Sequence, residues 1–313
     1  MNNTKIIKIP RELNNITIIN VIKNLEDFFT NNDENKAELN FEKTKFVFPS
    51  GLTPLISYLR DRYQKNDKKT IVINSKKSMV DSYLRRMKFF SLLGMNDNYF
   101  FKTWSGKEKF VEPYYFSKMT DPNKVNEKSE DIIKTFTVDR HSMYYNEAIG
   151  WCISEIIDNA QNHSNSDINV AMAQKYPSGV TEFCVSDRGI GIRESMGLNN
   201  TKLALERCIT KDKGIHSQGM GNGLYYTTEL IKRDTSGKCS MSIWTENYIL
   251  LLYSNSIPVI KETNAYWQGV NIKISMYNGI SESLSKLMKQ IDNVTYSYSY
   301  DEQPEYYENL FEN

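Results

Sequence analysis

The sequence lacks the features by which a chain is most easily assigned to a broad class. Its 313 residues contain no apolar run of about 18 residues or more, so we expect no membrane-spanning helix, and the N-terminal MNNTKIIKIP has no apolar signal core. An excess of positive charge is also absent, because 39 Lys and Arg residues face 38 Asp and Glu residues, which argues against a protein held to nucleic acid mainly by a basic face. We expect a cytoplasmic protein whose partner is neither a membrane nor a nucleic acid.

Cysteine and histidine are scarce as well. The four cysteines lie far apart and form no C-x-x-C pair, which favours reduced thiols in a cytosol over a disulfide scaffold or a zinc site. All three histidines follow residue 140, and the first 117 residues contain no glycine-rich loop. This N-terminal part therefore shows no catalytic constellation.

Strand and helix patterns alternate over residues 1–117. The β-prone segments TKIIKIP, LNFEKTKFVFP and TIVINS are separated by segments with apolar residues at helical spacing, such as IINVIKNLEDFF and LTPLISYLRDRY. This order favours a small layered α/β unit. The polar stretch 118–135 is typical of a linker. A second unit is expected over 136–280, followed by a C-terminal helix and an aromatic, acidic tail over 281–313.

The segment YYNEAIGWCISEIIDNAQNHS carries two different stripes when it is placed on a helix. One stripe is apolar and consists of Ile149, Ile153, Ile156, Ile157 and Ala160. The opposite stripe consists of Glu155, Asp158, Asn159 and Asn162, with no Lys or Arg among them.

Two acids on one stripe repel each other if exposed and need a partner if buried. Mg²⁺ is a suitable partner because it takes oxygen ligands, one or two of them from protein and the rest from phosphate and water. Asn159 can offer such an oxygen, and Glu155 can act as a general base. An ordinary solvated helix face is the alternative interpretation of the same residues.

Two glycine-rich motifs follow. In DRGIGI, Asp187 ends a strand pattern, and its carboxylate can accept a hydrogen bond from an exocyclic amine such as adenine N6. In GMGNGL, three glycines precede a helix, where bare backbone amides form an anion site suited to phosphates. A Rossmann motif does not fit, because a polar loop precedes GMGNGL, and a Walker A motif does not fit, because no Gly-Lys-Ser/Thr follows.

In this order and spacing the three segments resemble the ATP-binding domain shared by gyrase, Hsp90, histidine kinases and MutL, the GHKL or Bergerat fold. EIIDNAQNHS resembles its N-box, DRGIGI its first glycine box and GMGNGL its second, over residues 136–277. The N-terminal FVFPSGLTPLISYL and YLRRMKFFSLLGM are similar to a STAS-like regulatory domain. The resemblance implies an α+β chain: a C-terminal α/β sandwich, with helices over one face of a mixed sheet, preceded by a small STAS-like α/β domain.

The resemblance also implies ATP and Mg²⁺ as cofactors and a role for each motif residue. Asn159 would hold Mg²⁺, Asp158 would line the pocket, Asp187 would read adenine and Glu155 would be catalytic. The other nucleotide-binding residues would be Gly189, Gly191, Ile192, Gly219, Met220, Gly221, Asn222, Gly223 and Leu224. A cation on a lid running from about Leu198 to Gly219 would reach the γ-phosphate, and no motif decides between Lys211, Lys213 and His216.

One position departs from the family pattern. The last strand of the family often begins Gly-Thr, with the threonine hydroxyl near adenine, whereas this chain has Gly269-Val270. The missing hydrogen bond would weaken nucleotide binding by about 0.5–1.5 kcal/mol unless Thr245 or Ser186 compensates.

Three functions remain open for the bound ATP. The first is an ATP-gated regulatory switch with slow hydrolysis, in which Glu155 activates water. The second is a serine/threonine protein kinase of the anti-sigma type, in which Glu155 activates a hydroxyl of a partner protein. The third is a module that binds ATP without turnover. We rank the switch first, and we expect a partner protein or a second copy of the chain as its binding partner.

Overall fold

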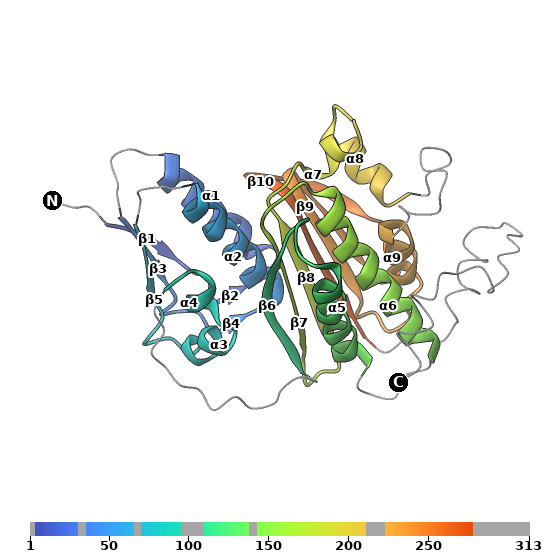
Figure 1. The fold of residues 1–313 in the computed structure, drawn as a ribbon, viewed down its shortest axis with the longest axis horizontal. Helices are drawn as coiled ribbons and strands as arrows, with labels where there is room; N and C mark the ends of the chain where they lie inside the picture. The colour runs from blue at the N-terminus through green and yellow to red at the C-terminus, as the bar shows by residue number, and fades with distance from the viewer. Residues whose placement is uncertain are drawn as a thin grey trace, which may run out of the picture.

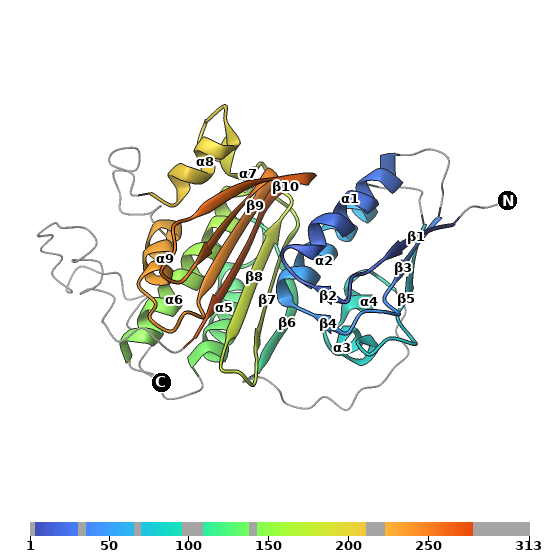
Figure 2. The same ribbon diagram turned by 180° about the vertical axis from the view of Figure 1, so that it is seen from behind.

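The computed structural model describes residues 4–30, 36–65, 70–95, 109–137, 143–210 and 223–277. These residues form two layered units that both mix helices and strands, so the expected α+β class is confirmed at this level (Figure 1, Figure 2). The expectations for residues 211–222 and for the C-terminal helix and tail at 281–313 lie outside the described residues. No described helix is both long and apolar enough to cross a membrane.

The N-terminal unit is built on a small parallel sheet. Its strands pair in the order β1 (Thr4–Lys8), β3 (Lys36–Asn40) and β5 (Thr70–Asn74). Parallel neighbours need crossover connections, and the connections contain α1 (Thr17–Thr30) and α2 (Pro49–Gln64). The remaining elements are β2 (Glu12–Leu13), β4 (Phe46–Val47), α3 (Asp81–Arg86) and α4 (Phe89–Leu92). The predicted alternation of strands and helices is confirmed here.

Helix α2 is buried over almost its whole length. Pro49 suits its first turn, because the fixed φ of proline is helical and no backbone N–H is lost there. Leu55 and Leu59 belong to one apolar core with Ile22 of α1 and Leu39 of β3. The opposite side of α2 carries small polar residues that are buried as well, so a second layer must cover it: Ser50, Thr53 and Ser57.

The C-terminal unit contains a five-stranded sheet in the order β6-β7-β8-β10-β9. Its strands are β6 (Phe110–Phe116), β7 (Asn169–Lys175), β8 (Thr181–Asp187), β9 (Ser240–Tyr253) and β10 (Val259–Met276). Its helices are α5 (Pro122–Thr137), α6 (Met143–Asp158), α7 (Gly191–Ser195), α8 (Thr201–Cys208) and α9 (Gly223–Lys232). The described strands of this sheet pair only antiparallel, so the expectation of a mixed sheet is wrong.

The boundary between the two units lies earlier in the chain than the sequence pattern suggests. Strand β6, expected within 1–117, pairs with β7 at the edge of the large sheet. The stretch 118–135, expected as a linker, lies mostly in helix α5, which buries Val125, Ile132 and Phe136. These apolar residues recur at helical spacing. The charged residues between them dominate the composition, and for that reason the stretch was predicted as a linker and not as a helix.

Both faces of the large sheet are covered. Helices α5, α6 and α9 lie on one face, whereas α1 and α2 of the N-terminal unit lie on the other (Figure 1, Figure 2). The alternation along β7 fits this arrangement, because Val170 and Met172 belong to the core of the N-terminal unit and Ala171 belongs to the core of the helical face. The helices of the C-terminal unit itself thus lie on one face of its sheet, and helices of the N-terminal unit cover the other face.

Candidate functional site

Asp187 ends strand β8 and is almost fully buried, with 4% of its surface exposed. Its Oδ1 accepts two backbone hydrogen bonds, from the N–H of Gly189 at 2.9 Å and from the N–H of Val270 at 3.2 Å. No described residue donates a hydrogen bond to its Oδ2. Burial raises the pKa of Asp187 to about 7, although the two backbone N–H groups favour its charged form. One oxygen is thus held by the fold, and the other is left to accept from something else.

Glycines let three chain segments meet around this carboxylate. A Cβ on Gly189 would lie 1.9 Å from the carbonyl oxygen of Ser164. A Cβ on Gly269, whose φ is +91°, would lie 2.5 Å from Oδ1 of Asp187. Only glycine fits either position without moving backbone. The sequence identified Gly189, but it gave no signal for the role of Gly269.

Thr245, rather than Ser186, lies beside this group. Thr245 Oγ1 donates to the carbonyl oxygen of Gly269 at 2.7 Å, and a Cβ on Gly191 would lie 3.1 Å from the same hydroxyl. Ser186 points to the opposite face of β8, where its hydroxyl bonds Asn271 Oδ1. Thr245 therefore lies on the same side as the Asp187 carboxylate, and Ser186 does not.

The apolar stripe predicted from Ile149 to Ala160 is confirmed, because all five of its residues are buried in the core of the C-terminal unit. The polar stripe lies on α6 and on the π-helical turn Asn159–His163 that follows it. Such turns are rare and frequently occur at functional sites. The sequence predicted an ordinary α-helix here and did not indicate the π-helical turn.

Glu155 is half-buried on α6. Burial, together with the negative charge of Asp158, raises the pKa of Glu155 to about 6. Asp158 and Asn162 are exposed, and Asn162 Nδ2 donates to Asp158 Oδ1 at 2.5 Å. Asn159 is half-buried, and its side chain makes no hydrogen bond with another described residue. Glu155 and Asn159 thus remain available, whereas Asp158 and Asn162 satisfy each other.

The start of α9 lies directly against Glu155. A Cβ on Gly223 would lie 2.6 Å from the Cβ of Glu155 and 3.0 Å from its Oε2. The helix N-terminus carries a partial positive charge, which suits both this carboxylate and an anionic ligand. Leu224, the next residue, packs against the core of the helical face, as Ile192 of α7 does. These two side chains support the site rather than line an open surface.

Most of the other predicted ligand residues cannot be placed. Gly219, Met220, Gly221, Asn222 and the lid cations Lys211, Lys213 and His216 lie outside the described residues. The beginning of the lid contains helix α8. Asn200 caps this helix, because its Oδ1 accepts from the N–H of Leu203 at 2.9 Å.

The side chains near Glu155 fit Mg²⁺ only if phosphate and water supply most of the ligands. The described residues contain no group of three or more His, Cys, Asp or Glu side chains that could hold a metal ion by themselves. A half-buried amide oxygen on Asn159, one helical turn after Glu155, fits an ion that takes most of its ligands from phosphate and water. The four cysteines form no disulfide.

Two comparisons with known proteins found no similar family or protein. A scan against protein-family models gives no match, and a search of the curated proteins gives none either.

Proposed function

We propose that residues 136–277 bind Mg²⁺-ATP as a GHKL-type domain and that the chain is an ATP-gated switch with slow hydrolysis. The observation that carries this proposal is the state of Asp187: it is buried at a strand end, its Oδ1 is fixed by two backbone N–H groups, and its Oδ2 takes no hydrogen bond from a described residue. A carboxylate in that state is suited to accept from the exocyclic amine of adenine.

The other groups have complementary roles in this proposal. The N-terminus of α9 faces the phosphates, because the N–H groups at a helix N-terminus suit an anion. Asn159 holds Mg²⁺, which would neutralise phosphate charge when bound. Glu155, with a pKa of about 6, is ionised at neutral pH and is basic enough to take a proton from water.

A switch is favoured over a kinase that phosphorylates its own N-terminal half. Helix α2 packs on the face of β8 opposite to Asp187, and the cores on the two faces of the sheet are separate. The N-terminal unit is therefore not presented to Glu155 as a substrate. A kinase acting on a separate partner is the second candidate, because the same base serves a serine or threonine hydroxyl.

ATP turnover by the whole chain, its Glu155→Gln variant and the matched exposed variant Glu206→Gln tests the proposal. Loss of a general base lowers turnover by about 10²–10⁴-fold. We expect this loss in Glu155→Gln with nucleotide binding retained, and unchanged turnover in Glu206→Gln. Equal turnover in all three proteins contradicts the role of Glu155. Transfer of γ-labelled phosphate to a co-purified protein, without free phosphate release, favours the kinase instead.

A further inference from the structure

Helix α2 is fastened to strand β8 at both of its ends. At its start, the N–H of Ser50 donates to Oε1 of Glu182 at 2.9 Å. Towards its end, Asp61 Oδ2 accepts from Nη2 of Arg188 at 3.3 Å. The helix rises about 17 Å between Ser50 and Asp61, and a strand advances about 20 Å between Glu182 and Arg188, so the two elements run side by side.

The second fastening is a buried ion pair between the two units. The side chains of Arg188 and Asp61 are only 6% and 9% exposed. The guanidinium also lies over two rings, with its Cζ 5.1 Å from the ring centre of Tyr58 on α2 and 4.7 Å from that of Trp267 on β10. Its Nε and Nη1 have no hydrogen-bond partner among the described residues. Asp61 is thus the carboxylate that compensates this buried charge, and it belongs to the N-terminal unit.

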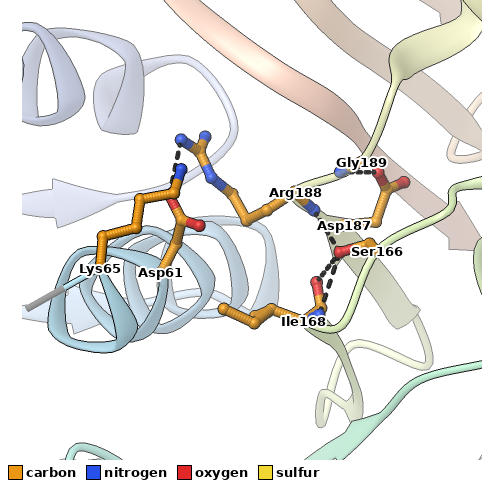
Figure 3. Close-up of polar contacts among 7 residues, drawn as sticks. All are labelled: Asp61, Lys65, Ser166, Ile168, Asp187, Arg188 and Gly189. Atoms are coloured by element: carbon orange, nitrogen blue, oxygen red, sulfur yellow. Dashed lines mark hydrogen bonds and ion pairs between the residues drawn. The ribbon is translucent and has the colours of Figure 1, made fainter. Parts of the chain in front are cut away.

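Arg188 directly follows Asp187, and its main chain contacts the segment that leads into β7. Its N–H lies 3.2 Å from both the hydroxyl of Ser166 and the carbonyl oxygen of Ile168. Successive side chains of an extended segment point to opposite faces, and Figure 3 shows Arg188 reaching to α2 while Asp187 turns away from it towards Gly189. A movement of α2 that pulls on Arg188 therefore moves the peptide that carries Asp187.

The contact between helix α2 and strand β8 is polar, whereas the contacts on either side of it are apolar. Strand β8 directs Glu182, Cys184 and Ser186 to the face of α2. On α2 itself, the hydroxyls of Ser50 and Ser57 have no hydrogen-bond partner among the described residues. A buried interface with unpaired hydroxyl groups is less costly to rearrange than a fully apolar one.

We propose that Arg188 is a positioning residue that couples Asp187 to the N-terminal unit through Asp61, so that nucleotide binding and the packing of α2 on the sheet change together. This inference rests on the proposed ATP site. Coupling between two sites is reciprocal: if α2 sets the position of Asp187, nucleotide on Asp187 must stabilise the packing of α2 by the same factor.

Asp61 offers a matched pair of variants. Asp61→Asn removes the charge that compensates Arg188. Lys65→Gln removes the other cation on the same carboxylate, whose Nζ lies 2.9 Å from Asp61 Oδ2 but whose side chain is 54% exposed. We expect ATP to bind Asp61→Asn about 5- to 150-fold more weakly, the usual range of such couplings, and to bind Lys65→Gln as it binds the wild type. Arg188→Lys, which keeps the charge, should lie between them.

Hydrogen exchange of the unsubstituted chain gives a second measurement that does not depend on a variant folding. We expect Mg²⁺-ATP to slow exchange in peptides from α2 and to lose this effect in Asp61→Asn. If the wild type binds ATP but α2 exchange does not respond and Asp61→Asn binds like Lys65→Gln, the coupling is wrong and the ATP site stands. If the wild type binds no ATP, the proposed function and the coupling are both overturned.

Discussion

Gly223 and Glu155 are in direct contact across the junction of α9 and α6. A Cβ on Gly223 would lie 2.6 Å from that of Glu155, a separation that two carbon atoms do not tolerate. The base proposed for hydrolysis and the helix N-terminus proposed for phosphate are thus held at one fixed spacing, and that spacing exists because residue 223 has no side chain.

Gly223→Ala tests this spacing. The added methyl group must push α9 away from α6, which costs about 1–3 kcal/mol of stability by overpacking, and it should reduce ATP turnover along with stability. Gly197→Ala is the control, because nothing lies within 4 Å of its Cβ and only its φ of +63° is strained. Urea unfolding and turnover of both variants check the prediction. Equal turnover in the two would show that the contact has no bearing on the site.

The pKa of Asp187 predicts opposite effects of pH on stability and on binding. Because burial raises this pKa to about 7, the folded state holds a proton that the unfolded state has already lost above about pH 4. The contribution of Asp187 to the free energy of unfolding is therefore lost as pH rises from about 4 through 7. Nucleotide binding, which uses the ionised carboxylate, should strengthen over pH 6–8.

Asp187→Asn isolates this contribution, because asparagine keeps an oxygen for the N–H groups of Gly189 and Val270. The difference in unfolding free energy between variant and wild type should grow in favour of the variant as pH rises from 5 to 8. A constant difference over that range would mean that Asp187 titrates normally and is not held in a buried environment.

Val270 predicts a gain of function. Its backbone N–H already bonds Asp187, and its side chain is where the resembling family carries a hydroxyl. We expect Val270→Thr to strengthen ATP binding by about 0.5–1.5 kcal/mol, and Thr245→Val to weaken it, since the buried carbonyl of Gly269 then loses its partner. Calorimetric titration checks both. Unchanged affinity in both variants would place adenine away from these residues.

The local motifs were the predictable part of the site. The spacing of Ile153 and Ile157 predicted a buried helix face, and Asp187 falls at a strand end followed by a tight glycine turn. These features depend on neighbours in the sequence, which is why the pattern contains them.

Features that depend on distant residues were not predictable. The pattern of β6 does not say that its partner is β7, some 60 residues later, and the glycine requirement at Gly269 exists only because Asp187 folds against it. The polar residues of α2, such as Ser57, are buried against the large sheet, and their neighbours in the sequence do not indicate that contact. Arg188 lies buried beside Asp61, which is 127 residues away in the sequence.

Calorimetric titration of the whole chain with ATP and Mg²⁺ tests the central claim most directly, with Asp187→Asn as the variant and Asp167→Asn as the exposed control. The account predicts measurable binding by the wild type and by Asp167→Asn, and loss of binding in an Asp187→Asn protein that remains folded. Absence of binding by the wild type, or equal affinity in all three proteins, would contradict it.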